Sequence, residues 1–274
     1  MRVAVVGHVE WIEFARVDRV PVAGEIIHAH EAWEEPGGGG AVAAVQLAKL
    51  AGGGRLFTAL GDDELGHRAQ RRLSELGLGV EAVFRSEPQR RGFVYVDGEG
   101  ERTITVIGSR LGPSHEDELP WELLRGMDAA YFTAGDAHAL AAARAARTLV
   151  ATARGLETLR EAHVPLDVLV ASAEDEDERY EHGDLDPPPR LVVRTAGEAG
   201  GSWEGEGASG RWDASPAPGP VSDAYGCGDS FAAGLTYGLA EGRSVQDAVE
   251  LGARCGAACL TGKGPFAGQL TSPD

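Results

Sequence analysis

Residues 223–231 read DAYGCGDSF and are the most informative stretch of the chain. Gly226 and Gly228 flank one small residue, and Asp229 follows at once. From Phe231 onward apolar and small residues recur with helical spacing, so a glycine turn leads into the first turn of a helix. Backbone N–H groups at a helix N-terminus bind anions, and glycines let a phosphate approach them closely. A carboxylate there would repel a phosphate unless it takes a proton from an attacking hydroxyl group. The stretch therefore favours a phosphoryl-transfer site with Asp229 as base, the alternative being an ordinary acid in a first helical turn.

This stretch resembles the C-terminal signature of the pfkB, or ribokinase-like, carbohydrate kinases, Asp-Thr-x-Gly-Ala-Gly-Asp-x-Phe. The resemblance implies that Asp229 is the catalytic base and that Asp223 belongs to the nucleotide-binding residues. It also implies an anion hole built from three consecutive backbone amides, those of Gly226, Cys227 and Gly228. Cysteine replaces the usual alanine in that hole, but it is small, and only its N–H is needed there.

A run of four glycines, 37–40, precedes a helix predicted over residues 41–51. It is not a Walker loop, because no Gly-Lys-Ser/Thr follows. The run resembles the family's N-terminal signature, Gly-Gly-x-Gly-x-Asn-x-Ala, which lines the sugar site. The resemblance therefore implies the following substrate-binding residues: Gly38, Gly39, Gly40 and Val42. Valine stands where the family usually has asparagine, and it can only pack.

Two further segments continue the resemblance in the family's order. Residues 61–66 read GDDELG and match its Gly-x-Asp-x-x-Gly, and residues 76–80 read LGLGV and match the Gly-Val that follows. One departure affects the substrate site, because Ile12 stands where family members often carry an aspartate. Glu10 and Glu13 lie nearby in sequence. Either glutamate is a candidate to hold a sugar hydroxyl, and both are equally consistent with ordinary surface acids.

A strand pattern that ends in threonine and is followed by two glycines predicts where the nucleotide lies in the site. Residues 194–200 read RTAGEAG and resemble the family's Thr-x-Gly-x-x-Gly, which implies that Thr195, Gly197 and Gly200 lie at the nucleotide phosphates. Upstream the family has Asn-x-x-Glu, whose glutamate organises Mg²⁺ through water. The matching residues are Ser172, Glu174 and Asp175, so serine replaces the asparagine and a shorter acid replaces the glutamate. We expect magnesium binding there to be weakened.

Composition excludes several other classes of protein. The chain has 274 residues, 43% of them hydrophobic, with 25 basic and 43 acidic side chains and a formal charge of −18. A chain this acidic is a poor binder of nucleic acid or anionic membranes. Its three cysteines do not make a disulfide framework, and no signal peptide or apolar run of transmembrane length is apparent. These features predict a cytoplasmic protein.

Strand and helix patterns alternate from residue 128 onward, which is typical of an α/β fold with a parallel sheet between helices. The resemblance implies a ribokinase-like three-layer α/β/α sandwich with a mostly parallel sheet and a small β lid. We expect a single kinase domain over residues 1–274, with lid segments at about 9–36 and 88–108. The pattern at 93–96 and 103–107 around Asp97-Gly98-Glu99-Gly100 predicts a β-hairpin within the second segment.

The resemblance implies ATP-dependent phosphorylation of a hydroxyl on a small sugar or sugar-like molecule, with ATP and Mg²⁺ as cofactors. A nucleoside or other small alcohol is the second candidate, because Val42 and Ile12 give the pocket an apolar lining. A catalytically weak nucleotide-binding regulatory protein is the third, motivated by the altered metal segment and by residues 151–154, where the family's Asp-x-Asn-x-Arg is incomplete. Family members occur as monomers and dimers, so a homodimer and a monovalent-cation requirement both remain open.

Overall fold

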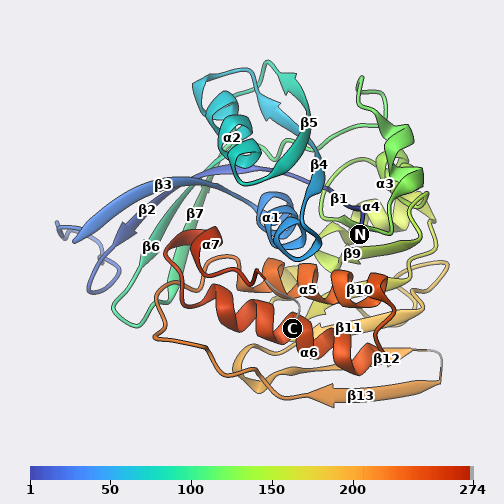
Figure 1. The fold of residues 1–274 in the computed structure, drawn as a ribbon. Helices are drawn as coiled ribbons and strands as arrows, with labels where there is room; N and C mark the ends of the chain where they lie inside the picture. The colour runs from blue at the N-terminus through green and yellow to red at the C-terminus, as the bar shows by residue number, and fades with distance from the viewer. Residues whose placement is uncertain (206, 272–274) are drawn as a thin grey trace.

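The computed structural model describes residues 1–205 and 207–271, which form two β-sheets and the helices around them (Figure 1). The larger sheet has nine strands, and all neighbours are parallel except the last two pairs at one edge. From that edge the strands are β13 (Ala208–Trp212), β12 (Gly201–Gly205), β11 (Leu191–Thr195), β10 (Val168–Ser172), β9 (Thr148–Thr152), β8 (Ala129–Phe132), β1 (Val3–Val6), β4 (Gly54–Gly61) and β5 (Leu78–Arg85).

Helices cover both faces of this sheet because its central strands are apolar on both faces. In β1, Val3 and Val5 belong to one buried cluster, whereas Ala4 and Val6 belong to the other. The first cluster lies under four helices, α1 (Gly39–Ala51), α2 (Glu64–Glu75), α5 (Cys227–Glu241) and α6 (Val245–Cys259). The second lies under α3 (Ala137–Ala143) and α4 (Leu156–Ala162). The short α7 (Gly264–Ala267) packs beside α1 and α6. The predicted three-layer α/β/α sandwich is therefore confirmed.

The smaller sheet extends to one side of the sandwich (left in Figure 1). Its four strands, in spatial order, are β3 (Glu31–Gly37), β2 (Glu10–Arg16), β6 (Arg91–Val96) and β7 (Arg102–Ile107). Apart from Gly37 at the end of β3, these strands fall within the two segments expected to form the lid, and this sheet is called the lid sheet below. β6 and β7 are antiparallel, with Arg91 opposite Ile107, as the hairpin prediction requires. The tip of this hairpin contacts the loop before α5, where the Ala224 N–H donates to the Gly100 carbonyl at 3.0 Å.

Two parts of the chain differ from the sequence-based expectation. The antiparallel hairpin β12–β13 was not predicted, because its glycine-rich strands lack a clear apolar alternation. The many acids between residues 174 and 186 favour a solvated helix face followed by a surface loop, yet this stretch contains only a short 3₁₀ turn at Glu176–Glu178. Clustered acids repel one another, and the three prolines that follow oppose a longer helix.

Candidate active site

The glycine turn before α5 has the backbone conformation that the sequence predicts. Gly226 is the N-cap residue and has φ = 84°, a left-handed conformation that glycine adopts without strain. A Cβ added to it would lie 2.8 Å from Cγ1 of Val42. A Cβ added to Gly228 would meet nothing within 4 Å, so the space beside this turn is open. The first N–H groups of a helix lack intrahelical acceptors, and here they adjoin open space suited to an anion.

Cys227 contributes its backbone to this turn and not a reactive thiolate. A hydrogen bond with Cys259 and burial both raise the pKa of the Cys227 thiol, so the thiol stays neutral. That the N–H of Cys227 takes part in an anion hole stays a prediction. Cys255 and Cys259 are fully buried core residues.

Asp229 lies in the first turn of α5 and is partly exposed. Its Oδ1 is so close to Gly39 that an added Cβ there would lie 2.8 Å away. The N-terminal glycine run and the C-terminal motif, about 190 residues apart in sequence, therefore meet at this carboxylate. Burial, and then the nearby charge of Glu178, raise the pKa of Asp229 to about 7, despite the opposing charges of Arg154 and Arg102. A carboxylate with such a pKa is suited to accept a proton at neutral pH.

The glycine run is held against the C-terminal motif by a buried hydrogen bond. The N–H of Gly38 donates to Oη of Tyr225 at 3.0 Å, and Gly38 has φ = 82°. Tyr225 also packs edge-on against Phe14 of the lid. Gly40 allows the closest approach, since an added Cβ would lie 2.5 Å from the carbonyl oxygen of His8. These contacts explain why the chain has glycine at 38, 39 and 40.

Of the two candidate glutamates, the structure brings only Glu10 to the glycine run. Its Cγ would lie 3.1 Å from a Cβ added at Gly38. Glu13 follows Glu10 by three residues in β2, and side chains alternate between the two faces of a strand. The Glu13 side chain therefore lies on the other face of the lid sheet, where it pairs with Arg91 at 3.5 Å. Ile12, which replaces the family's aspartate, is buried between Gly37 and Gly92. Val42 is fully buried beneath Gly226.

The ends of two neighbouring parallel strands carry the residues expected at the nucleotide. Ser172 ends β10 and pairs in register with Thr195, which ends β11. Gly197 follows with φ = 49°, and a Cβ added there would lie 3.0 Å from Oε2 of Glu174. Ser172 Oγ accepts the N–H groups of Glu174 and Asp175 at 3.2 and 3.1 Å. These predicted residues are therefore brought together at the carboxyl edge of the sheet, where ligands of α/β folds bind.

Asp175 is engaged by an arginine that motif comparison did not single out as a site residue. Its Oδ2 lies 2.5 Å from Nη2 of Arg154, which also pairs with Glu178 at 2.7 Å. Desolvation opposes the charged form, but hydrogen bonds from Arg154 and from the Asp177 N–H lower the pKa of Asp175 overall. Arg154 belongs to the incomplete segment 151–154, and its contact with Asp175 shows that this segment still reaches the site.

Two other predicted residues have mainly structural contacts. Asp223 is fully buried, and its carboxylate accepts the N–H groups of Tyr225 and Gly264 at 2.9 and 3.0 Å. Gly200 packs against the following hairpin, where an added Cβ would lie 2.1 Å from the carbonyl oxygen of Trp212. Asp223 thus ties the anion-hole loop to the start of α7.

Three residues that contact the site are not marked by the sequence motifs: His8, Arg90 and Tyr225. His8 and Arg90 lie outside the glycine motifs, and Tyr225 occupies a position that the family's signature leaves unspecified. No local spacing marks one arginine among many as a site residue, so only their spatial position identifies them.

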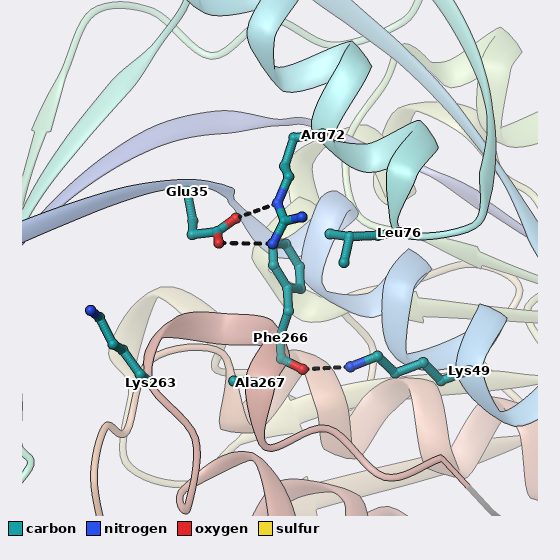
Figure 2. Close-up of a pocket in the computed structure, with 7 residues that line it drawn as sticks. All are labelled: Glu35, Lys49, Arg72, Leu76, Lys263, Phe266 and Ala267. Carbon is teal, nitrogen blue, oxygen red and sulfur yellow. Dashed lines mark hydrogen bonds and ion pairs between the residues drawn. The ribbon is translucent and has the colours of Figure 1, made fainter.

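A separate hollow of about 260 Å³ lies away from these residues (Figure 2). It is formed between α1, α2, α7 and β3, and it is lined by Glu35, Lys49, Arg72, Leu76, Lys263, Phe266 and Ala267. Its cations are already engaged. Arg72 forms two hydrogen bonds to Glu35, and Lys49 donates to the Phe266 carbonyl. None of the predicted site residues lines this hollow.

The fold and the site together define a phosphotransferase of the α/β class, and comparison with known proteins agrees. A model of the pfkB family carbohydrate kinases matches residues 1–271, and the chain belongs to this family. It is 30% identical over 277 residues to an ATP-dependent ribose-1-phosphate kinase of Halopiger xanaduensis, covering 94% of this chain and 91% of the relative.

Two solved structures share the fold. A putative ribokinase from Agrobacterium tumefaciens has a TM-score of 0.82 at 23% identity, over 98% of this chain and 94% of that one. Arabidopsis thaliana ribokinase, complexed with ribose and ATP, has a TM-score of 0.73 at 19% identity, over 99% of this chain and 96% of that one.

Proposed function

We propose that this protein transfers the γ-phosphoryl group of ATP to a hydroxyl group of a small sugar or sugar-like molecule. The observation that carries the proposal is the position of Asp229. Its carboxylate lies against the glycine run, in the first turn of α5, with a pKa of about 7. A base is thus placed between the expected acceptor site and a helix N-terminus suited to a phosphate.

In the proposed reaction Asp229 accepts the proton of the attacking hydroxyl group. The N–H groups of Gly226, Cys227 and Gly228 stabilise the negative charge that develops on the transferred phosphoryl group. Glu10 accepts a hydrogen bond from the acceptor beside Gly38. The lid sheet excludes water, so that hydrolysis of ATP is limited.

ATP as the phosphoryl donor is supported by the names of two similar proteins, one ATP-dependent and one complexed with ATP. In this chain the nucleotide would lie along Ser172, Thr195 and the Gly197 turn, at the ends of β10 and β11. The contacts of Asp223 and Gly200 favour an indirect role for both in shaping that site.

Glu174 and Asp175 are the proposed magnesium residues. Within residues 1–205 and 207–271, no three His, Cys, Asp or Glu side chains are grouped closely enough to hold a metal ion alone. A magnesium ion that is bound mainly by nucleotide phosphates and water needs only one or two carboxylates, which these residues provide. Bound there, Mg²⁺ would neutralise charge on the nucleotide phosphates. Because Arg154 engages Asp175, we expect its contribution to act through water.

Mutation of Asp229 tests the proposal directly. We expect Asp229→Asn to lower turnover on the order of 10²–10⁴-fold and to leave ATP binding largely intact, because only the base is lost. The matched control is Asp247→Asn, an acid at the same position in the first turn of α6. ADP release would be measured with ribose, fructose, adenosine, hydroxymethylpyrimidine, ketodeoxy sugars and sugar phosphates. Near-normal turnover of Asp229→Asn would overturn the assignment of the base. ATP binding without transfer to any acceptor would instead favour the regulatory alternative.

The acceptor panel also separates a sugar from a nucleoside. Ile12 and Val42 are both fully buried, so their side chains do not give the pocket an exposed apolar surface for a flat base. This observation favours the sugar.

Three further proposals concern the protein's surroundings. None of the helices in the described residues has the length and apolar character needed to cross a membrane, and a cytoplasmic location stays a prediction.

A homodimer through the lid would use the exposed edge strand β7, which displays Ile104, Val106 and Ile107. Sedimentation measures the oligomeric state, and activity with and without potassium measures the monovalent-cation requirement.

A further inference from the structure

The imidazole ring of His8 lies at the end of a central strand of the main sheet. β1 ends at Val6, and its neighbours in the sheet are β4 and β8. The chain reaches β4 on one side of β1 and returns to β8 on the other side, and ligands of α/β folds bind at the carboxyl ends of such strands. His8 follows β1 by two residues, and its side chain is only 8% exposed. A polar ring is therefore buried where this sheet is expected to bind a ligand.

This ring borders both the glycine run and the proposed base. A Cβ added at Gly38 would lie 3.1 Å from Cδ2 of His8. A Cβ added at Gly39 would lie 3.7 Å from Cε1 of His8 and 2.8 Å from Oδ1 of Asp229. His8 and Asp229 thus flank the same glycine, so one small molecule bound at the glycine run can contact both side chains.

Neither ring nitrogen of His8 has a hydrogen-bond partner among residues 1–205 and 207–271. Nδ1 is buried and unpaired. Nε2 lies 3.7 Å from Oε1 of Glu10, which is too far for a hydrogen bond, and Nε of Arg90 lies 2.7 Å from that same oxygen. Buried polar atoms are normally paired, so an imidazole with two unpaired nitrogens indicates a ligand that completes its hydrogen bonds.

The charge state of His8 decides which chemical group fits it. Burial, followed by the charges of nearby arginines, lowers the pKa of His8 to about 3, so the ring is neutral at pH 7. A neutral imidazole has one donor and one acceptor nitrogen, and a hydroxyl group likewise both donates and accepts. An anion would only accept hydrogen bonds, and it would meet the carboxylate of Glu10 beside the ring. A hydroxyl group therefore fits His8 best.

We propose that His8 is a specificity-determining residue that binds a second hydroxyl group of the acceptor, apart from the hydroxyl group that faces Asp229. This inference rests on the proposed function and narrows its substrate class, because an acceptor with a single hydroxyl group would leave the imidazole unpaired. The acceptor is then a polyhydroxyl molecule, either a sugar or the ribose of a nucleoside, and not a simple alcohol. His8 holds it from the end of β1, and Asp229 approaches it from α5.

Acceptor binding to the Asp229→Asn protein tests the inference without any need for turnover. Isothermal titration would compare ribose, ribose 1-phosphate and adenosine, each beside its 2-deoxy and 3-deoxy counterparts, with hydroxymethylpyrimidine, which has a single hydroxyl group. Adding His8→Phe keeps a ring of similar size and removes both nitrogens. We expect it to weaken binding of the best acceptor about 5–100-fold, because a buried hydroxyl group loses its partner, and to leave ATP binding unchanged.

The deoxy acceptors separate a lost hydrogen bond from a change in packing. The analogue that lacks the hydroxyl group bound by His8 should bind equally well with and without the His8→Phe substitution, whereas the intact acceptor should not. His8→Gln, which keeps a donor and an acceptor, should restore part of the lost affinity. The matched control is His67→Phe, since this imidazole on α2 pairs with Asp62 at 3.1 Å outside the site. It should leave acceptor binding unchanged.

Thermal unfolding without ligand separates a binding role of His8 from a structural one. Because neither ring nitrogen is paired, we expect the Tm of His8→Phe to stay at the wild-type value or to rise. A lower Tm together with unchanged acceptor binding would show that His8 serves the fold, and the proposal would be wrong.

Other results would contradict the proposal in different ways. An equal loss of affinity for intact and deoxy acceptors in His8→Phe, tighter binding of hydroxymethylpyrimidine than of every other probe, or no binding of any probe would overturn the role of His8. Transfer of phosphate from ATP to hydroxymethylpyrimidine by the wild type would overturn it too, yet it would uphold the kinase. Acceptor binding that depends on His8, without transfer from ATP in the wild type, would uphold the hydroxyl contact and overturn the proposed kinase reaction.

Discussion

At the scale of single residues, Asp229 shows how surroundings change the chemistry of a carboxyl group. A helix N-terminus stabilises the charged form of an acid in its first turn and lowers its pKa. Burial outweighs this effect at Asp229 and raises the pKa to about 7. The group is therefore half protonated near neutral pH, which is useful for a base and costly for the stability of the ionised protein.

The pH dependence of kcat/KM should report this pKa. The base must be ionised to accept a proton, so we expect kcat/KM to rise about tenfold per pH unit below pH 7 and to level off above it. The measurement is ADP release at saturating ATP from pH 5 to 9, with the best acceptor of the panel. A rate already maximal at pH 5 would show that Asp229 is not the titrating base. An acceptor without a phosphate group serves as control, since a phosphate titrates near pH 6.

Because Gly39 has no side chain, there is room beside it for the carboxylate of Asp229. Gly39→Ala would place a Cβ 2.8 Å from Oδ1 of Asp229 and push the carboxylate aside. We expect kcat/KM to fall on the order of 10²-fold, because a displacement of about 1 Å at the base disrupts the reacting geometry. Gly155→Ala is the control, since a Cβ there meets nothing within 4 Å and φ is −96°. Equal activities of the two variants would refute the contact.

At the scale of elements, the site depends on how the start of α1 is joined to the start of α5. Tyr225 connects them through the N–H of Gly38, and Asp223 holds the backbone of Tyr225. Asp223 also accepts the N–H of Gly264 at the start of α7. Burial raises the pKa of Asp223, although these two N–H groups act in the opposite direction. A single buried carboxylate thus holds the loop that is proposed to carry the anion hole.

Asp223→Ala should therefore destabilise the whole fold. Two buried N–H groups would lose their acceptor, so we expect the free energy of unfolding to fall by about 2–4 kcal/mol. Urea unfolding measures the change, with exposed Asp213→Ala as the control. If stability stays unchanged while the KM for ATP rises, Asp223 contacts the nucleotide directly and its structural role is minor.

At the scale of the whole molecule, hydrogen bonds to backbone groups join the lid sheet to the loop before α5. Nη1 of Arg16 donates to the Ser222 carbonyl at 3.0 Å, and the hairpin tip meets Ala224 through Gly100. The first contact lies directly before the motif at 223–231, and the second lies at the second residue of that motif. The lid is thereby joined to the loop proposed to bind the transferred phosphoryl group, so we expect closure of the lid and organisation of this loop to be coupled.

Loosening this contact should uncouple ATP consumption from transfer. With Arg16→Ala we expect ADP release without acceptor, relative to release with it, to rise roughly several-fold, because water gains access to the site. The control is Arg19→Ala, whose side chain pairs with Glu25 within the lid loop. A ratio that stays at the wild-type value in Arg16→Ala would mean that this contact does not control closure.

Sequence by itself determined the fold class, the family and the two glycine motifs, because these depend on local backbone requirements. Gly226 and Gly38 adopt positive φ, and Gly39 and Gly40 allow close approach, so their patterns are visible in the chain. Only the tertiary structure shows that Glu10, and not Glu13, lies beside the glycine run, since the two faces of β2 have different neighbours. It alone paired Arg90 with Glu10, because charge interactions depend on distance in space, which the order of residues along the chain does not contain.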